Sequence, residues 1–366
     1  MKQLNKKIIY LFFAYAPSEI VRGNVFENNF IEAGFYIRYF RVYSLIVQKL
    51  IILLERYAIL QPLVFFFLKT QMVIRRIKIW YALNIVKKYN AVVVVKYCTP
   101  SILNSIKKKS TAKVLYDFDD AVWLDQFLGQ KTFKQIVMSV DYISCDNEFL
   151  ANYARQYNSK VFVLNGPPQV ELFDEYRKNH PKSSGGKIKI GWLGSQSTLF
   201  YLYAILEPLE IIGKKFKNVE LILIGTGDRP SMIPRFENLI VRNIPKYDQE
   251  KMIQLVSDID IALYPLFDNM LSIGRGILKA SIYMSAGIPV VASSIGDNIH
   301  LISTGQTGFL ASTKDEWVDA LSKLIFDSNL RKRMGDNARL LMKQKFSKDI
   351  CFNQIFENFL SKLDHD

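Results

Sequence analysis

The sequence predicts an α/β protein with two domains, each built on a parallel β-sheet. Short apolar runs recur along the chain and a helical pattern follows each run, as in sheets that are buried on both faces and covered by helices. A new series of runs begins halfway along, where residues 187–197 read Lys-Ile-Lys-Ile-Gly-Trp-Leu-Gly-Ser-Gln-Ser. A chain of 366 residues, 49% of them hydrophobic, can supply both cores, and we expect the domains to face a cleft.

The first domain is expected over residues 1–180. Its expected strands are 8–14, 91–95, 114–118, 142–145 and 161–164. A long helical region is expected between the first two strands, over residues 26–89. Two groups of turn residues, Asn165-Gly-Pro-Pro and the segment 181–186, mark the exit from this domain, so the linker is expected between them.

The second domain is expected over residues 187–345. Its expected strands are 188–193, 219–224, 259–264 and 289–293. Helical patterns with apolar faces then cover 327–345 and 348–363. We expect residues 346–366 to form a C-terminal helix that packs back on the first domain.

The positive charge of the chain is concentrated in its first third. Residues 1–113 contain 19 Lys and Arg against 4 acidic residues, a net charge of +15, whereas the whole chain carries +14. Such an asymmetry favours an anionic partner. Nucleic acid is disfavoured, because no recognised binding module accompanies the charge.

Aromatic and aliphatic residues are mixed with these cations at 35–43, 45–54 and 63–68. The mixture is typical of helices that lie in a membrane interface, and it predicts an anionic membrane surface as a partner. The cations placed to reach lipid head groups are Arg38, Arg41, Lys49, Arg56, Arg75, Arg76 and Lys78. The alternative is a core helix with a solvated basic edge. No run reaches the roughly 18 uninterrupted apolar residues that a membrane span requires.

The cysteines and histidines exclude several kinds of site. Cys98, Cys145 and Cys351 are odd in number and far apart, which argues against a disulfide framework, fits a reducing cytosol and predicts small buried side chains. The three histidines stand in no context typical of a catalytic triad, and the residues that bind metals form no set with ligand spacing. We therefore expect no metal site.

Glycine-rich loops follow the first two strands of the second domain. Gly194, Ser195 and Gln196 end the first strand and begin a helix, where backbone N–H groups can hold phosphate oxygens. Gly225 and Gly227 follow the second strand and permit a ligand to approach closely. Packing alone would also explain these glycines.

Two cations follow the third strand of this domain. Arg275 and Lys279 are four residues apart, a spacing that on a helix puts both on one face near the N-terminus. Two charges and a helix dipole would stabilise a diphosphate leaving group there, although both cations would also fit a solvated surface. The loop 293–298 follows the next strand and is placed to close over a bound sugar.

Three carboxylates follow a strand of the first domain, in Asp117-Phe-Asp-Asp120. Similar pairs of aspartates hold a divalent ion and a nucleotide in some enzymes, but the nucleotide-type loops here lie in the other domain. Two interpretations remain: Asp119 and Asp120 orient an acceptor hydroxyl, or they cap the next helix.

Four segments together resemble glycosyltransferase family four, the retaining transferases with the GT-B fold of two Rossmann-like domains. They are YDFDDAVW at 116–123, GWLGS at 191–195, DIALYP at 260–265 and LKASIYMSAGIPVVASSIGDN at 278–298. The likeness spans about residues 90–350. It implies that the second domain binds a nucleotide diphosphate sugar and the first holds an acceptor. It also implies transfer with retained configuration and no cofactor beyond the sugar nucleotide.

The resemblance also assigns roles to single residues. Lys279 matches a lysine that many relatives carry before Glu-Tyr-Met-x-x-Gly, and Arg275 lies beside it, so both are expected to be catalytic by balancing charge on the diphosphate. The expected donor-binding residues are Gly194, Ser195, Gln196, Gly225, Gly227, Tyr264, Gly274 and Ile282. The expected acceptor-side residues are Asp119 and Asp120.

The sequence departs from this family at two places. Residues 195–203 contain no cation, where many relatives have an Arg and a Lys that hold the diphosphate. The usual pair of glutamates that contact the sugar and the ribose would fall at Gly274 and Ile282. Arg275 and Lys279 would then have to bind the diphosphate alone.

Two functions are compatible with these observations. The first is a retaining glycosyltransferase of polysaccharide, lipopolysaccharide or glycolipid synthesis, peripheral on the cytoplasmic face of a membrane and acting on a lipid-linked acceptor. The second is a catalytically weakened relative that serves as a binding or assembly subunit. A nicotinamide dehydrogenase is excluded because no Gly-x-Gly-x-x-Gly follows a strand.

Overall fold

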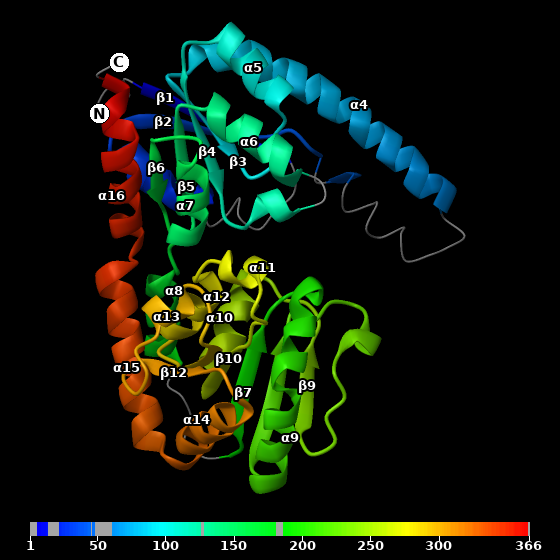
Figure 1. The fold of residues 1–366 in the computed structure, drawn as a ribbon, viewed down its shortest axis with the longest axis vertical. Coiled ribbons are helices and arrows are strands. Elements are labelled where there is room, and N and C mark those ends of the chain that lie inside the picture. Colours follow the sequence, from blue (N-terminus) through cyan, green and yellow to red (C-terminus); the bar gives the residue numbers. More distant parts are fainter. Residues whose placement is uncertain are drawn as a thin grey trace. The chain divides into compact units, whose positions relative to one another are not determined.

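The computed structural model describes residues 6–13, 22–44, 46–47, 61–125, 128–180 and 186–364 (Figure 1). The chain forms two compact units. The first unit comprises Met1–Gly166 and Cys351–Asp366, and the second comprises Pro167–Ile350. The chain therefore passes between the units twice.

The first unit is built on a sheet of six parallel strands. Across the sheet they are β2 (Phe35–Arg41), β1 (Lys6–Phe12), β3 (Ala91–Val95), β4 (Lys113–Phe118), β5 (Tyr142–Cys145) and β6 (Val161–Val163). Strand β1 pairs with β2 on one side and β3 on the other, so that Ile8 is aligned with both Ile37 and Ala91. The strand order thus reverses between β1 and β3, which is where parallel sheets of this kind bind ligands.

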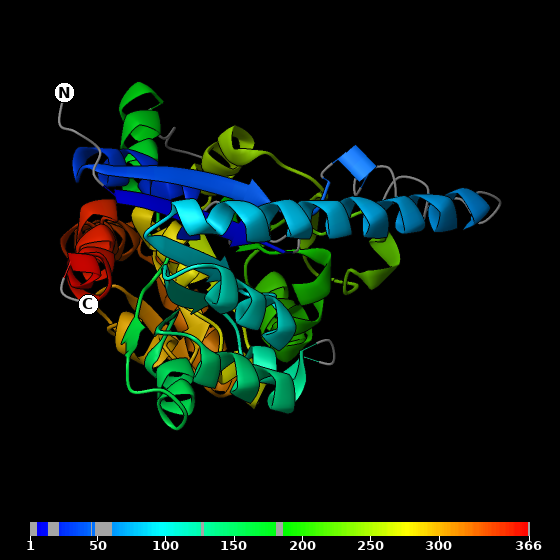
Figure 2. The same ribbon diagram turned by 90° about the horizontal axis from the view of Figure 1, so that it is seen from above.

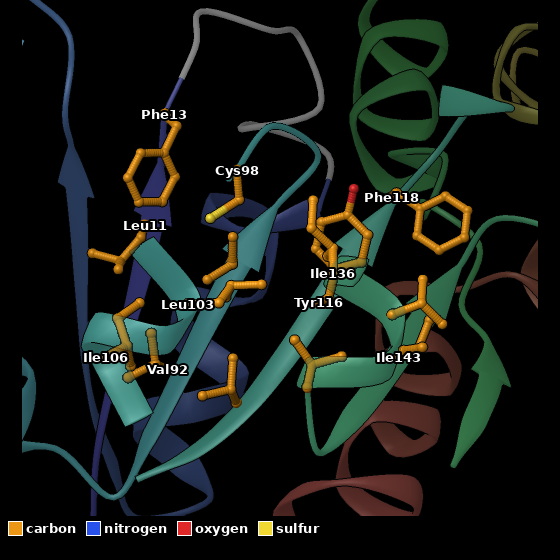
Figure 3. Close-up of a cluster of buried hydrophobic side chains, with 14 of the residues drawn as sticks. Leu11, Phe13, Val92, Cys98, Leu103, Ile106, Tyr116, Phe118, Ile136 and Ile143 are labelled. Carbon is orange, nitrogen blue, oxygen red and sulfur yellow. The ribbon is translucent and has the colours of Figure 1, made fainter. Parts of the chain in front are cut away.

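Alternate residues of these strands face two separate cores. Figure 3 shows one core, in which Leu11, Val92 and Tyr116 of the sheet meet Leu103, Ile106 and Ile136 of the covering helices. The helices and short 3-10 turns of this unit are η1 (Asn24–Phe26), α2 (Glu27–Glu32), α4 (Gln61–Ile85), η3 (Val86–Lys88), α5 (Pro100–Lys109), η4 (Val122–Leu124), α6 (Gly129–Ser139) and α7 (Glu148–Arg155). The intervening strand residues face the other core, because side chains alternate across a sheet.

The long helical region expected over 26–89 is only partly helical. Strand β2 lies within it and pairs along its whole length with β1. Its sequence, Phe-Tyr-Ile-Arg-Tyr-Phe-Arg, is rich in aromatic residues, which favour strands. Two arginines interrupt the apolar run, which an edge strand tolerates because it is only partly buried. Of the expected apolar run 45–54, only residues 46–47 lie within the described residues, and Ala14 lies outside them.

The second unit contains another sheet of six parallel strands. Across the sheet they are β12 (Gly308–Ala311), β11 (Val290–Ser293), β10 (Ile261–Tyr264), β7 (Ile188–Leu193), β8 (Val219–Ile224) and β9 (Ile240–Ile244). The four expected strands are present. The two edge strands were not predicted from the sequence, because β9 is partly exposed and carries Arg242 and Asn243, and β12 is only four residues long.

Helices cover both faces of this sheet. They are α8 (Val170–Asn179), η5 (Gln196–Ile205), α9 (Leu206–Lys215), η6 (Pro230–Met232), α10 (Gln249–Ser257), α11 (Met270–Ile273), α12 (Leu278–Ser285), α13 (Asn298–Leu301), α14 (Lys314–Phe326) and α15 (Ser328–Lys345). Local signals set the helix starts: Thr313 and Glu316 form a reciprocal capping box at α14, and Asp327 caps α15. The face with Ile190 and Trp192 packs on α9 and α14, and the opposite face packs on α10, α12 and α15.

The boundary between the units differs from the expected one at residue 180. Val170 and Phe173 of α8 are buried in the core of the second unit, so this helix belongs there rather than to the first domain. At the C-terminus, α16 (Lys348–Asn358) and η7 (Leu360–Asp364) follow α15. Cys351 and Phe352 of α16 are buried with the strands of the first unit, whereas residues 346–350 belong to the second.

The three cysteines are buried thiols, as the sequence predicts. Burial raises the pKa of the Cys98 thiol to about 12, which is typical of a structural thiol rather than a reactive one. Among the residues described here, none of the helices combines the length and the apolar character needed to cross a bilayer.

Candidate functional site

The strand order of the second unit places a candidate site between β7 and β10. Strand β7 lies next to β10 on one side and β8 on the other. From β7 the chain adds β8 and β9 on one side of the sheet, and it then adds β10, β11 and β12 on the other side. Ligands of doubly wound sheets bind at the carboxyl ends of the strands at such a switch point. The loops that follow β7 and β10 therefore flank the site.

The loop after β7 is held in a tight turn. Ser195 caps η5, and its backbone N–H donates a 2.9 Å hydrogen bond to Oγ1 of Thr198. A side chain at Gly194 would collide with the Trp192 ring and with Thr198, so only glycine fits this close approach. Ser195 is exposed and its hydroxyl lies 2.9 Å from that of Ser197, so two hydroxyl groups are available at the end of the strand.

Lys279 reaches this turn from another element. It is the second residue of α12, and its Nζ donates a 3.2 Å hydrogen bond to Thr198 Oγ1. The same ammonium lies 5.7 Å from the centre of the Trp192 ring, within the range of a cation–π contact. The position of Lys279 is thus defined by two residues of the β7–η5 segment.

Arg275 is positioned by the next turn of η5. Its Nε donates a 3.2 Å hydrogen bond to Tyr201 Oη, and its guanidinium carbon lies 5.2 Å from the centre of the same ring. Ser272, which is buried, donates a second 3.2 Å hydrogen bond to Tyr201 Oη. Asn269 caps α11 by accepting from the Ser272 backbone N–H, and this cap fixes the loop that carries Arg275.

The two cations are not arranged as the sequence analysis expected. Arg275 lies in the loop between α11 and α12, because α12 begins only at Leu278. The two residues therefore do not share one helix face at a spacing of four. They are brought together instead by η5, where Thr198 and Tyr201 provide their partners.

The expected donor-binding glycines have a packing role in the structure. Gly225 and Gly227 adopt φ values of +84° and +76°, which favour glycine. A side chain at Gly225 would strike the Gly194 carbonyl, and one at Gly227 would strike the side chain of Gln196. The loops after β7 and β8 thus pack directly against each other and present adjoining backbone at the same edge of the sheet.

The remaining expected donor residues lie at the end of β10 and in α12. Tyr264 is buried and its hydroxyl lies 3.4 Å from the Gly276 carbonyl. Gly274 ends α11 as its C-cap residue. Ile282 is half-buried and packs against the core of the second unit, so an apolar environment surrounds the position of the usual second glutamate.

Two exposed aromatic side chains beside the cations were missed by the sequence analysis. Phe200 of η5 and Phe267 of the loop after β10 have nearly parallel rings with centres 6.0 Å apart, and each also contacts Tyr201. Both are more than a third exposed. The available signal was an aromatic residue in each of the segments that follow the adjacent strands β7 and β10. Such rings offer an apolar face to a nucleobase or a sugar.

At the carboxyl edge of the first sheet, Asp119 and Asp120 share one lysine that the sequence analysis missed. Nζ of Lys96 lies 2.8 Å from Asp119 and 2.5 Å from Asp120. Burial and the neighbouring Asp120 raise the pKa of the Asp119 carboxyl, and Lys96 opposes that shift. Neither carboxylate caps the next helix, because Ala121 is the N-cap of η4 and no side chain caps it.

Lys96 also has an unusual backbone. Its φ is +58°, the one positive value among the described non-glycine residues. Its carbonyl accepts a 2.6 Å hydrogen bond from Tyr116 Oη, and its N–H donates to the Asp117 carbonyl at 2.7 Å. Left-handed backbone of this kind costs about 1–2 kcal/mol in a residue such as lysine, so these contacts must hold it.

Asp117 belongs to a separate buried network that joins three strand ends. Arg22, only 2% exposed, donates from Nε and Nη2 to the two oxygens of Asp117, each at 2.6 Å. Its Nη1 donates to Asp146 at 2.8 Å and to the Leu164 carbonyl at 3.1 Å. Burial would lower the pKa of Arg22, but its carboxylate partners raise it overall. This network is structural, because all of its charged groups are satisfied internally.

The family model for "Glycosyl transferases group 1" matches residues 189–327. The capsular polysaccharide biosynthesis glycosyltransferase CapM of Staphylococcus aureus is 24% identical over 173 residues, which cover 45% of this chain and 44% of the relative. The D-inositol 3-phosphate glycosyltransferase of Corynebacterium efficiens is 28% identical over 148 residues, or 37% of this chain and 33% of the relative. The matches thus span less than half the length of these curated relatives.

Solved structures resemble the chain over nearly its whole length. A glycosyltransferase from Rickettsia africae has a TM-score of 0.70 at 15% identity, covering 99% of this chain and 100% of that chain. HepE of Anabaena in complex with UDP has a TM-score of 0.64 at 14% identity, covering 97% of this chain and 100% of that chain. These likenesses confirm the predicted GT-B fold class of two Rossmann-like sheets.

Proposed function

We propose that the chain transfers a sugar from a nucleotide diphosphate sugar to an acceptor, because residues 189–327 match the family model of the group 1 glycosyl transferases. The observation that carries the proposal is the convergence of Arg275 and Lys279 on η5 at the switch point of the second sheet. Two fixed cations at the carboxyl end of β7 suit a diphosphate. The neighbour HepE was solved with UDP, which supports a nucleotide ligand for a chain of this fold.

The cations would act on the leaving group. When the bond between the sugar and the diphosphate breaks, negative charge builds on the diphosphate oxygens. Cations that are already held by Tyr201 and Thr198 need little reorganisation to stabilise that charge. We propose that Arg275 and Lys279 perform this role, and that the sugar is transferred with retention of its configuration.

The donor would lie along the loops after β7, β8 and β10. Backbone and hydroxyl groups at Gly194 and Ser195, together with Gln196, would bind the phosphates and ribose. The loop of Gly225 and Gly227 adjoins them through direct backbone packing. Phe200 and Phe267 would support a ring of the substrate through their exposed faces.

The acceptor would be held by the first unit. Asp119 and Asp120 are kept in place by Lys96 at the carboxyl edge of that sheet, and Asp120 remains half-exposed and able to accept a hydroxyl proton in a hydrogen bond. We propose a lipid-linked acceptor and a peripheral location on the cytoplasmic face of a membrane, in polysaccharide, lipopolysaccharide or glycolipid synthesis. The charge of the first 113 residues and the relative CapM support this choice.

A second candidate function is a catalytically weakened family member that acts as a binding or assembly subunit. It is favoured by Gly274 and Ile282, which stand where relatives carry glutamates. Ile282 packs against the apolar core of the second unit, so this position itself offers no carboxylate. The two functions differ in whether a bound nucleotide sugar is turned over.

The test is calorimetric titration of UDP, GDP, ADP and their sugars into the native chain, Arg275→Ala and Lys279→Ala. Each lost charge-assisted contact should weaken selective binding by roughly tenfold or more. Arg333→Ala removes an exposed cation of α15 and serves as the matched control, with unchanged affinity expected. Hydrolysis of the bound nucleotide sugar, or its transfer to lipid extracts, would favour the transferase over the binding subunit. Absence of binding at millimolar ligand would contradict the transferase and favour the assembly subunit.

A further inference from the structure

Helix α4 presents a row of large apolar side chains to the outside of the first unit. Phe66, Val73, Ile77 and Trp80 are 55–66% exposed. At about 100° per residue they fall within a sector of about 60°, so they form one stripe along the helix. We call these four residues the outer stripe. Figures 1 and 2 both show α4 extending past α5 and α6 of its unit, with its amino-terminal half standing away from the sheet.

Packing within the first unit accounts for the opposite face of the helix. Val64 and Ala82 are buried, and Gln71 donates to the Ser44 carbonyl at 3.5 Å. Lys78 donates to the Arg41 and Tyr43 carbonyls at 3.2 and 2.9 Å. These residues explain why the helix is docked on the unit. They leave the outer stripe unexplained, because it lies on the other side.

The charges beside the outer stripe are all positive. Helix α4 contains Lys69, Arg75, Arg76 and Lys78 and no acidic residue. Lys69 and Arg76 are seven residues apart and exposed, so they form a row next to the outer stripe. The ammonium of Lys69 lies 4.5 Å from the centre of the Phe65 ring, which is itself 60% exposed. Cations and large apolar groups thus share one surface.

We propose that α4 docks the protein on an anionic lipid bilayer by lying in the plane of the interface. The outer stripe would enter the boundary between head groups and acyl chains, and Lys69 and Arg76 would contact the lipid phosphates. Trp80 suits this depth because indole is enriched at membrane interfaces. The helix is about 38 Å long, but its four cations exclude a spanning orientation.

A bilayer fits this surface better than a second copy of the chain. Pairing two copies through α4 would bring cations together without acidic partners on either helix, and like charges in contact repel. A bilayer provides both an apolar layer and negative charge over the length of the helix. The inference rests on the proposed function, in which a lipid-linked acceptor lies at a membrane, and it names the surface that would reach it.

The first experiment measures how much of the full chain sediments with vesicles. One set of vesicles is phosphatidylcholine alone, and the other also contains about 30 mol % of the anionic lipid phosphatidylglycerol. Native protein should bind the anionic vesicles, and the binding should fall with salt. Phe66→Ser/Ile77→Ser and Lys69→Gln/Arg76→Gln should each bind at least about tenfold more weakly. The matched controls are Phe326→Ser/Leu340→Ser and Lys332→Gln/Arg333→Gln, which change exposed residues of the second unit and should bind like native protein.

The second experiment uses Trp80 as a built-in probe. The other three tryptophans are buried, so Trp80 is the one that a bilayer can reach. Its emission should shift to shorter wavelength on anionic vesicles and be quenched by brominated acyl chains. Trp80→Phe should remove the quenching but keep most of the binding, because phenylalanine is also apolar.

Four outcomes would overturn the inference. Equal binding to neutral and anionic vesicles would contradict it, as would native-like binding of both α4 variants. A dimer seen by light scattering that Phe66→Ser/Ile77→Ser converts to a monomer would show that the outer stripe is a protein interface. Nucleotide binding separates this inference from the proposed function. If the native chain binds nucleotide but does not bind anionic vesicles, only the membrane surface is contradicted. The α4 variants should bind nucleotide as tightly as the native chain does.

Discussion

Tyr201 Oη accepts hydrogen bonds from both Arg275 Nε and Ser272 Oγ, each at 3.2 Å. The ring of this tyrosine also lies under the Arg275 guanidinium, with 5.2 Å between the guanidinium carbon and the ring centre. One buried side chain of η5 therefore orients a cation of the loop after β10. The relationship joins the two loops that flank the switch point of the second sheet.

Tyr201→Phe tests this orientation. The variant keeps the ring and removes Oη, so Arg275 loses its hydrogen bond and Ser272 loses a buried partner. We expect nucleotide diphosphate affinity to fall about 2- to 12-fold, which corresponds to the net 0.5–1.5 kcal/mol of one hydrogen bond. The unfolding free energy should fall by about 1–3 kcal/mol because the Ser272 hydroxyl is left unsatisfied.

Tyr203→Phe is the matched control, since Tyr203 lies in the same 3-10 segment and is 53% exposed. It should change neither nucleotide affinity nor stability appreciably. Calorimetric titration and urea unfolding measure both quantities. Equal nucleotide affinity in the native chain and Tyr201→Phe would show that Arg275 does not depend on Tyr201.

The strands that the sequence predicted are those with continuous burial. All five residues of Ala91–Val95 are buried, so an apolar run marks this strand without help from its neighbours. The missed strand Phe35–Arg41 lies at the sheet edge and its side chains are mostly half-exposed, so two arginines interrupt its apolar pattern. Pairing with β1, rather than the local pattern, makes this segment a strand.

The site was predictable one loop at a time but not as an assembly. Arg275 and Lys279 could be identified because they follow a strand, where a parallel sheet binds ligands. Their partners Tyr201 and Thr198 lie 74 and 81 residues earlier in the sequence. Contacts at such separations depend on how η5 packs, which no local spacing encodes. The spacing of four between the cations suggested a shared helix face, and the late start of α12 made that interpretation wrong.

Lys96 should stabilise the acceptor-side carboxylates. Lys96→Gln removes the ammonium that lies between Asp119 and Asp120, and we expect the unfolding free energy to fall by about 1–2 kcal/mol after allowing for partial exposure. Transfer activity should fall, whereas nucleotide affinity should stay native because the loops proposed to bind the donor lie in the other unit. A loss of nucleotide affinity would contradict this division of roles.

Lys96→Asn separates the charge from the backbone. Asparagine also lacks the ammonium but tolerates the left-handed φ of +58° better than glutamine. We therefore expect Lys96→Asn to be more stable than Lys96→Gln, by about 0.5–1 kcal/mol in urea unfolding. Equal stability of the two variants would show that the backbone conformation relaxes when the ion pairs are lost.

The buried Arg22 should matter far more to stability than an exposed arginine. Arg22→Met leaves Asp117 and Asp146 without their cation in the interior, and removing one partner of a buried ion pair typically costs about 3–5 kcal/mol. Arg155→Met is the comparison, because Arg155 pairs with Glu148 near the surface of α7 and such pairs contribute about 0–1 kcal/mol. Similar losses for the two variants in urea unfolding would contradict the assignment of Arg22 as a structural centre.

Asp146 should make the stability of the chain depend on pH. Burial raises the pKa of its carboxyl to about 7, and Arg22 only partly opposes this shift. An unfolded aspartate titrates near 3.9, so between about pH 4 and pH 7 the folded chain holds a proton that the unfolded chain has released. Stability must then fall as pH rises through this window, because the unfolded state binds fewer protons.

Asp146→Asn removes this proton and keeps an oxygen that can accept from Arg22 Nη1. The test is urea unfolding of both proteins at pH 5, 6, 7 and 8. Up to about pH 7, the free energy of unfolding of the native chain should decline relative to that of the variant. Above pH 7, the difference between the two free energies should stay constant. The decline is limited to about 1.4 kcal/mol per pH unit, the value for one proton. Asp336→Asn makes the same chemical change at an exposed position of α15 and serves as the control. A native stability that stays parallel to that of Asp146→Asn between pH 5 and 7 would mean that Arg22 holds the carboxylate ionised in the folded chain, because neither state would then bind a proton in this window.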